Sequence, residues 1–474
     1  MIWTLAWKNI WRNKKRSLVV IFAVTLGIIS GMFLIGFVEG WSRQRLHDAI
    51  YNEVSHLQIH NSEYPGNEET DLTVINPVRL VLHIDSLKEL RSWAKRTRIV
   101  AMANTPWGNT GLTLFGIDPE REKLLTEIHD RIVPGGGRYI DSGNPSGILI
   151  SDKTADLLRL KHYILTDSVM EELRHEKIPV SVLERINQLR NVRFRSLKDF
   201  REGLMPLLTG KETARYGFLI SGKALNYRLR NRVQVTISDI DGNPVQGIFR
   251  VCGVFKTANT GFDQSAAFVN AAELARQYGS GEIPVHEIAI LLNDIDDADM
   301  VKNTLNAVAG GNSVMTWKEL APEAALMNEF MFAYYLVFIG IIMLALAFGI
   351  INTMLMAVLE RTKELGMLMA IGMNRRRIFT MIMLETIFLT FVGAAAGTVA
   401  GLALIAVLGK TGIHLGSWRE GFEAIGFAAT VYPFVTPAFI VFTVIMVTVT
   451  AVISSIWPAR KALKLNPVEA LRTE

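Results

Sequence analysis

Three groups of residues in this 474-residue sequence have types and spacings that chemistry could use. His56 and His60 would chelate a metal ion on a helix, but on a strand they lie about 13 Å apart, at about 3.3 Å per residue. The segment 210–213 is close to the end of a phosphate-binding loop, yet Glu212 breaks the required Gly-Lys-Ser/Thr order. We therefore expect neither a metal site nor a nucleotide site at these positions.

Four aspartates form the third group, at Asp294, Asp296, Asp297 and Asp299. A calcium-binding loop would also need a central glycine and a distal glutamate, so this run is predicted to begin a helix instead. The sequence contains no Gly-x-Ser-x-Gly motif and no Cys/His nucleophile pattern, and its single cysteine, Cys252, cannot form an intrachain disulfide. We therefore expect a non-catalytic chain with no metal and no cofactor of its own.

The composition describes a folded chain with little net charge. Hydrophobic residues make up 50% of it, which excludes disorder for most of its length. The 50 lysines and arginines exceed the 45 acidic residues by 5, far from the dense basic surface of nucleic-acid-binding proteins. No nucleic-acid partner is expected. At about 100 to 200 residues per domain, the length allows two to four structural units.

Four apolar stretches are each long enough to cross a bilayer, which takes about 20 helical residues. They cover residues 17–38, 330–359, 378–409 and 434–457. The first is predicted to be an uncleaved helix over residues 17–40, because the run is too long for a signal peptide and lacks a small-x-small cleavage site. The predicted fold class is an α-helical integral membrane protein with four transmembrane helices, one plus three, and a large domain between helices 1 and 2.

Basic residues near the ends of these stretches predict the orientation. Three clusters fall on one side of a four-span topology, whereas the segment between the last two spans balances Lys410 and Arg419 with Glu420 and Glu423. The clusters consist of Lys8, Arg12, Lys14, Lys15 and Arg16, of Arg361, Lys363, Arg375, Arg376 and Arg377, and of Arg460, Lys461, Lys464 and Arg472. Because basic flanks stay on the cytoplasmic side, both termini are expected inside and the large domain outside.

The start of the chain has an amphipathic pattern. On a helix over residues 1–16, Trp3 and Trp7 lie on one face and Lys8 and Arg12 on the other. This pattern is typical of a cytoplasmic helix that lies in the membrane interface. The alternative is that these residues are simply the start of the first span.

Inside the apolar stretches, Glu385 is the one charged residue. It is expected either to have a structural role near the cytoplasmic face, where it pairs with the arginines at 375–377 or reaches the interface, or to have a mechanistic role. Small residues at four-residue spacing predict close helix packing, either within the chain or between two copies. These helix-packing residues are Gly27, Gly31, Gly393, Gly397 and Gly401.

Residues 41–328 are predicted to form a mixed α+β extracytoplasmic domain, because periodicities near two and near 3.6 alternate along them. Strands are expected near 57–60, 233–237 and 247–255, and helices at 270–278 and 297–308. A charged, helix-prone segment near 162–215 is predicted to be an insertion. Five residues recur 70 positions later, which indicates either a local duplication or a chance similarity of two strand-to-helix junctions. They are Gly147, Leu149, Ile150, Ser151 and Lys153, and then Gly217, Leu219, Ile220, Ser221 and Lys223.

Two motifs after the large domain resemble the FtsX/MacB superfamily of ABC-transporter permeases. Residues 352–366 (NTMLMAVLERTKELG) and 370–376 (AIGMNRR) resemble its first signature, and residues 458–472 resemble its terminal signature. The resemblance covers an FtsX-like permease domain over 329–474 well and matches a MacB-like periplasmic domain over 41–328 loosely. It implies an inner-membrane location.

The resemblance also implies partners. In that superfamily two permease copies, or a permease and a paralogue, assemble with two cytoplasmic ATPase subunits, which bind ATP and Mg. A cytoplasmic coupling segment near 360–377 docks into the ATPase, and mechanotransmission carries its closure to the outer domain. By resemblance, the coupling residues are Glu360, Arg361, Thr362, Lys363, Glu364, Leu365, Gly366, Ala370 and Gly372. Apolar contact is expected from Leu365 and from residues 367–369.

Four spans, a large outer domain and no fused ATPase are most similar to the lipoprotein-releasing permeases of the LolC/LolE type. These extract lipoproteins from membrane lipids and pass them to a periplasmic carrier. The alternatives are an efflux or peptide-resistance permease that works with a periplasmic partner, and an FtsX-like regulator of a cell-wall hydrolase.

Overall fold

The computed structural model describes residues 3, 7, 12, 14–67, 69–141, 143–176, 178–238, 243–277, 284–416, 421–422, 428 and 430–463. The chain divides into two compact units. The helical unit comprises residues 1–44, 326–419 and 428–474, and the α+β unit comprises residues 45–325 and 420–427. Each unit has its own core, and each is described by itself.

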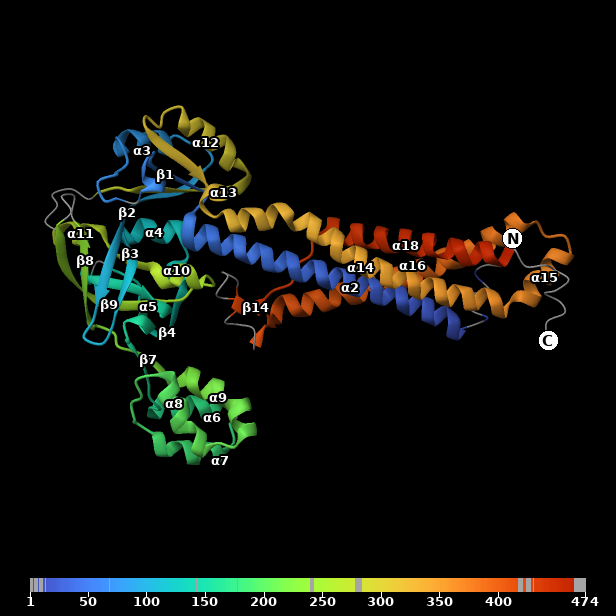
Figure 1. Ribbon diagram of the computed structural model, residues 1–474, viewed down its shortest axis with the longest axis horizontal. Coiled ribbons are helices and arrows are strands. Elements are labelled where there is room, and N and C mark those ends of the chain that lie inside the picture. Colours follow the sequence, from blue (N-terminus) through green and yellow to red (C-terminus); the bar gives the residue numbers. More distant parts are fainter. Residues whose placement is uncertain are drawn as a thin grey trace. The chain divides into compact units, whose positions relative to one another are not determined.

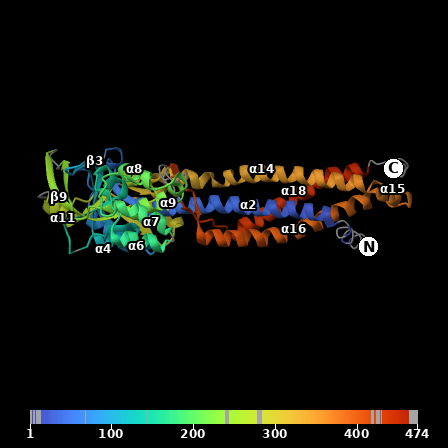
Figure 2. The same ribbon diagram turned by 90° about the horizontal axis from the view of Figure 1, so that it is seen from below.

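Four long helices make up most of the helical unit. They are α2 (Lys14–Asp48), α14 (Pro322–Glu360), α16 (Arg375–Thr411) and α18 (Pro437–Leu463), and Figures 1 and 2 show them side by side. All four are long and apolar enough to cross a membrane. The predicted order of one span, a large domain and then three spans is therefore confirmed.

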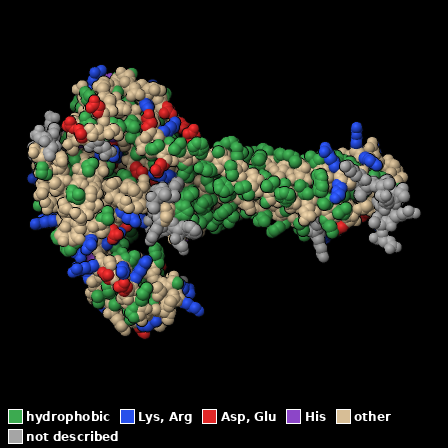
Figure 3. Space-filling model, in the orientation of Figure 1, with side chains coloured by type: hydrophobic (Ala, Val, Ile, Leu, Met, Phe, Trp, Pro, Cys, Tyr) green, Lys and Arg blue, Asp and Glu red, His purple; other side chains and the backbone are tan. Residues whose placement is uncertain are grey.

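The helices are apolar all round, and that explains how they pack. Each buries one stripe: on α2 the stripe runs through Val24, Ile28 and Met32, which are fully buried at four-residue spacing. Large apolar side chains such as Phe22 and Ile341 remain exposed on the outer faces. Figure 3 shows hydrophobic side chains over much of the visible surface of these helices. A helix that is apolar on every face is suited to lipid outside and helix contact inside.

One lobe of the α+β unit is an antiparallel sheet in the order β12-β1-β11-β2. Its strands are β1 (Leu57–Asn61), β2 (Leu90–Asn104), β11 (Glu287–Leu292) and β12 (Asn312–Thr316). Helices α3 (Pro77–Asp85) and α12 (Ala298–Asn306) contribute Leu80, Ile84 and Val301 to the core of this lobe.

The other lobe is a closed ring of strands. The pairing runs β2-β3-β10-β5-β9-β8 and returns from β8 to β2, so β2 serves both lobes. The further strands are β3 (Asn109–Ile117), β5 (Gly147–Ser151), β8 (Arg232–Ser238), β9 (Pro244–Phe255) and β10 (Ala266–Asn270), with β4 (Ile132–Gly137) at the edge beside β9. Alternate residues such as Val233, Val235 and Ile237 are buried in its core.

A helical insert leaves the ring through the two-stranded sheet of β6 (Lys161–Tyr163) and β7 (Leu225–Tyr227). It consists of α6 (Asp167–His175), α7 (Val180–Ile186), α8 (Leu197–Leu204) and α9 (Gly210–Ala224). Residues such as Leu173, Val182 and Phe200 form a core of its own. The helical segment continues to Ala224, beyond the expected end near residue 215.

The shorter helices of the α+β unit follow strands. They are α4 (Pro119–Leu125), α5 (Asp152–Leu157), α10 (Thr260–Ser265), α11 (Ala271–Gln277) and α13 (Trp317–Leu320). The strands expected near 57–60, 233–237 and 247–255 and the helices expected at 270–278 and 297–308 are confirmed within a few residues, although residue 278 lies outside the described part. The expected repeat of strand-to-helix junctions is wrong. Its first copy is β5 followed by α5, whereas its second copy lies wholly inside α9.

Candidate functional site

The two histidines with possible metal spacing are engaged in structural hydrogen bonds. His60 Nδ1 lies 3.0 Å from the His286 carbonyl and its Nε2 lies 2.9 Å from Gln58 Oε1. His56 Nδ1 accepts from the Leu292 amide at 2.9 Å, and burial lowers the His56 pKa to about 4. Among the described residues, no three His, Cys, Asp or Glu side chains are placed to hold a metal ion.

The other two groups of residues with possible chemical spacing, at 210–213 and 294–299, lie at the starts of helices. Thr209 and Glu212 form a capping box at the start of α9, in which the Thr209 amide donates to Glu212 Oε2 at 2.8 Å. The residue that breaks the phosphate-loop motif therefore has a capping role. Asp294 accepts from the Asp296 amide at 3.0 Å, just before α12, as predicted.

The segment near 360–377, which is predicted to couple to an ATPase, contains a separate short helix, α15 (Thr362–Ala370), between α14 and α16. Lys363, Met367 and Ile371 are exposed at four-residue spacing and share one face; Met367 is 51% and Ile371 is 78% exposed. Leu365 and Gly366 are buried on the opposite side. The expectation that Leu365 offers apolar contact to a partner is therefore wrong, because it packs into the core of the helical unit. The large exposed apolar residues are Met367 and Ile371, whereas Leu368 and Met369 are partly buried against the same core.

Arg361, in the link between α14 and α15, is joined to Glu385 of α16. Its Nη1 lies 3.0 Å and 3.1 Å from the two carboxylate oxygens, and both side chains are mostly buried. The expected pairing of Glu385 with the arginines at 375–377 is wrong. These precede it on the same helix by about 12 Å or more, at about 1.5 Å per residue, whereas Arg361 comes alongside from another element. This ion pair fixes the start of α15 against α16.

The other residues predicted for coupling are placed as follows. Thr362 Oγ1 donates to the Leu359 carbonyl at 2.6 Å, which tightens the turn into α15. Gly372 has a φ of +94° just beyond α15, where a side chain would be strained. Ala370 and Gly372 are exposed, as are Glu360 and Glu364.

The first residues of the chain touch this region. Arg12 forms a hydrogen bond and ion pair with Glu364, and the rings of Trp3 and Trp7 contact Phe388 of α16 at 5.8 Å and 5.6 Å between centroids. The rest of the expected amphipathic helix over 1–16 lies almost entirely outside the described residues. Residues 464–472 of the terminal motif also lie outside them.

Three glycines of α16 are in contact with α2. An added Cβ at Gly393 would lie 2.8 Å from Val24 Cβ, at Gly397 3.0 Å from Ile28 Cβ, and at Gly401 2.8 Å from Met32 Sδ. Thr25 Oγ1 also donates to the Gly393 carbonyl at 3.1 Å. Of the two alternatives, the structure places this stripe within the chain. The glycines of α2 face other helices, Gly27 toward Leu346 of α14 and Gly31 toward Thr443 of α18.

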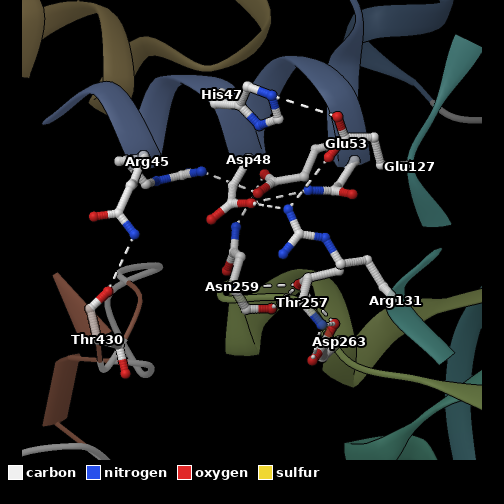
Figure 4. A network of polar contacts seen from close by, with 12 residues as sticks. Arg45, His47, Asp48, Glu53, Glu127, Arg131, Thr257, Asn259, Asp263 and Thr430 are labelled. Atoms are coloured by element: carbon white, nitrogen blue, oxygen red, sulfur yellow. Dashed lines mark hydrogen bonds and ion pairs between the residues drawn. The ribbon is translucent and has the colours of Figure 1, made fainter. Parts of the chain in front are cut away.

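A polar network surrounds the end of α2 in the α+β unit, where the chain continues as the π-helix η1 (Ala49–Val54). Arg45 Nη1 lies 3.0 Å from Glu53 Oε1, and Arg131 Nη2 lies 2.9 Å from Asp48 Oδ1. Asn259 Nδ2 donates to Glu53 Oε2 at 3.0 Å. Figure 4 shows these side chains pointing toward one another. The network ties residues 45–54 to the segments around Arg131 and Asn259, and sequence reasoning missed it because its partners are far apart in the chain.

Asp263, beside this network, has an unusual environment. Burial raises its pKa to about 7, although Thr257 donates to its carboxylate through the backbone amide at 3.1 Å and the hydroxyl at 2.8 Å. Burial likewise raises the pKa of the Cys252 thiol to about 12, so this thiol is almost wholly protonated at neutral pH.

The permease signature has counterparts among known proteins. Residues 336–467 match the family model described as FtsX-like permease C-terminal. An uncharacterized ABC transporter permease of Methanocaldococcus jannaschii is 28% identical over 232 residues, which are 48% of this chain and 55% of that protein. The uncharacterized ABC transporter permease YknZ of Bacillus subtilis is 26% identical over 247 residues, which are 50% of this chain and 56% of that protein.

A further relative is the macrolide export ATP-binding/permease protein MacB of Chlorobium luteolum, 34% identical over 126 residues, which are 27% of this chain and 16% of that protein. The crystal structure of the extracellular domain of YknZ aligns with 55% of this chain and 99% of that domain, at 14% identity and a TM-score of 0.28. The chain spans about half the length, or less, of these curated relatives. Residues 336–467 thus match an FtsX-like permease domain, and these relatives are permeases of ABC transporters that include MacB and YknZ.

Proposed function

We propose that this chain is the non-catalytic permease subunit of an ABC transporter, and that it relays ATP hydrolysis by a separate cytoplasmic ATPase to an α+β unit outside the cytoplasm. ATP and Mg would be bound by that ATPase, and a second permease copy or a paralogue would complete the assembly. The observation that carries the proposal is α15, a short helix with an exposed face and a buried back.

The exposed face of α15 has the chemistry of a docking surface. Lys363 and Glu364 offer charges, and Met367 and Ile371 offer apolar area that would be covered by a partner. Behind it, Leu365 packs into the helical unit and the Arg361–Glu385 ion pair holds the preceding link. A force on α15 would therefore reach α14 and α16 directly.

The apolar spans favour a mechanical relay over a hydrophilic pore. Within the four apolar stretches the sequence has one charged residue, Glu385, and Arg361 pairs with it. A path for a polar substrate would need more polar lining than this. Helices α2 and α14 both continue across the division between the two units, at residues 44/45 and 325/326, so movement of the helices is passed on through covalent structure.

For the cargo we propose lipoprotein release, which rests on the four spans and the large outer domain. Export with a periplasmic partner is the second candidate, and it is favoured by the relative MacB, a macrolide export ATP-binding/permease protein. Photo-crosslinking from exposed positions of the α+β unit separates the two. Capture of a lipoprotein or its carrier supports release, and capture of a tunnel-forming partner without lipoprotein supports export.

The relay is tested at Ile371. The substitution Ile371→Asp places a charge directly after α15, in line with its exposed apolar face, and we expect copurification of the ATPase to fall at least about tenfold, since burying an unpaired charge costs more than about 1.4 kcal/mol. The matched control is Asn374→Asp, which adds the same charge nearby and keeps the helix cap, because Asn374 Oδ1 accepts from the Arg376 amide at 3.0 Å. Undiminished ATPase association in Ile371→Asp would contradict the docking role of α15.

A further inference from the structure

Two paired strands and one isolated bridge at the root of the helical insert bring basic residues onto one face. In β6 and β7, Tyr163 pairs with Leu225 and His162 pairs with Asn226. The Arg228 amide donates to the Leu160 carbonyl at 2.9 Å, so the pairing continues. Since side chains alternate along extended strands, His162 and Arg228 lie on the same face of this ribbon.

The third segment joins from the other side of β6. The amides of Tyr163 and Phe194 each donate to the other's carbonyl at 2.9 Å, which makes these two residues a directly opposed pair. Their neighbours Arg193 and His162 therefore share the opposite face, while Tyr163 and Phe194 pack in the core of the insert. Diagonal neighbours on such a face are about 7 to 8 Å apart, within reach of long side chains.

Two polar atoms of this cluster are buried and have no hydrogen-bond partner in the described structure: His162 Nδ1 and Arg228 Nε. The His162 residue is only 7% exposed. The ion pairs recorded between described residues of the insert use other cations, among them Arg185, Arg190 and Lys223, and not Arg193 or Arg228. Buried polar groups nearly always have a hydrogen-bond partner in folded proteins, so these two atoms are positioned to bond to a bound ligand.

The cluster is electropositive and partly fixed in place. Burial, followed by the charges of Arg193 and Arg228, lowers the pKa of His162 to about 4, so its imidazole is neutral at pH 7. The Arg228 guanidinium carbon lies 4.3 Å from the centre of the Trp107 ring. Trp107 itself follows Thr105, whose hydroxyl donates to the Leu158 carbonyl at 2.9 Å and so anchors the loop between β2 and β3. Stacking of this kind fixes the orientation of the guanidinium, so its N–H groups can donate two parallel hydrogen bonds to an anion.

We propose that Arg193, Arg228 and His162 form a binding site for a phosphate group. Two guanidinium groups match the charge of a phosphate dianion, and their forked donors match its oxygens. A neutral imidazole with an unpartnered nitrogen supplies one further hydrogen bond. The phosphate could be free in solution or carried by a lipid headgroup, because both present the same oxygens to the site.

The test uses the full chain in detergent and isothermal titration calorimetry with two probes, inorganic phosphate and the short-chain soluble lipid dihexanoyl phosphatidate. We expect Arg228→Gln and Arg193→Gln each to weaken binding about tenfold or more, since one charge-assisted hydrogen bond is worth at least about 1.5 kcal/mol. The matched control is Arg174→Gln on the exposed side of α6, which makes the same charge change within the insert and should leave the affinity unchanged.

Either probe can support the site, and their comparison identifies the source. Equal affinity for both probes indicates a site for free phosphate, whereas tighter binding of the phosphatidate indicates a lipid headgroup. Arg193 is exposed, so its substitution leaves the fold intact and keeps the test decisive even if Arg228→Gln unfolds the insert. Absence of binding for both probes, or equal binding by native protein and Arg193→Gln, would overturn the proposal and leave water as the partner of His162.

Discussion

At the scale of single residues, buried charges in this chain are paired with residues that are distant in sequence. Arg96 lies 2.7 Å from Glu122 and 2.6 Å from Glu287, and all three are almost fully buried. The sequence predicted that Glu385 needs a cation, because an unpaired charge in an apolar span is costly. It could not identify Arg361, since the choice among several arginines depends on which helices lie side by side.

Asp263 yields a prediction about pH. Its folded pKa is raised from 3.8 to about 7, so the protonated form stabilises the fold at low pH and this stability is lost as pH rises from about 4 to about 7. We expect Asp263→Asn to remove a slope of about 1.4 kcal/mol per pH unit in the free energy of unfolding across that window. Chemical unfolding of both proteins at a series of pH values measures it, and identical slopes would contradict the assignment.

At the scale of elements, a local sequence pattern determined a helix or strand only where no helix had already begun upstream of it. The residues shared by 147–153 and 217–223 fit a strand that leads into a helix, and Ser151 does cap α5. In the second copy the capping box at Thr209 has already begun a helix at Gly210, so the same residues continue it. The repeated residues could therefore be found in the sequence, but the different structures of the two copies could not be predicted from it.

The glycines of α16 give a prediction about helix packing. Gly397→Leu would force its side chain against Ile28 and Thr25 of α2, so we expect stability to fall by about 1 to 3 kcal/mol. The matched control is Gly340→Leu on α14, where an added Cβ meets nothing within 4 Å. Thermal unfolding in detergent measures both variants. Equal melting temperatures would mean that the contact between α2 and α16 does not hold the helices together.

At the scale of the whole molecule, hydropathy was sufficient for the order of the four spans and insufficient for the α+β unit. Hydropathy and length alone identify a transmembrane stretch, because lipid acts on each helix separately. The ring of strands depends on pairings such as Ala103 of β2 with Val235 of β8, far apart in the chain. No local periodicity encodes such a pairing, so the ring could not be predicted.

The orientation of the chain is a prediction of its own. We expect Lys198→Cys, exposed on α8, to react with a membrane-impermeant maleimide on intact cells, and Asn374→Cys to react only after permeabilisation. Ser42 is a poor labelling site because it is buried, and the native Cys252 should stay silent because its raised pKa leaves little thiolate. Labelling of Asn374→Cys on intact cells would show that the orientation is opposite to the predicted one.

The paired strands β6 and β7 have a further consequence. Because Tyr163 lies directly opposite Leu225, the two cut ends would sit within hairpin distance if the stretch 164–224 were excised, and a two-residue turn such as Asn-Gly could rejoin them. The stretch also contains its own apolar centre, so its loss would strip little from the neighbouring ring. Replacing this stretch by a two-residue turn could thus yield a shorter, still foldable protein, and this portion could evolve as a detachable module.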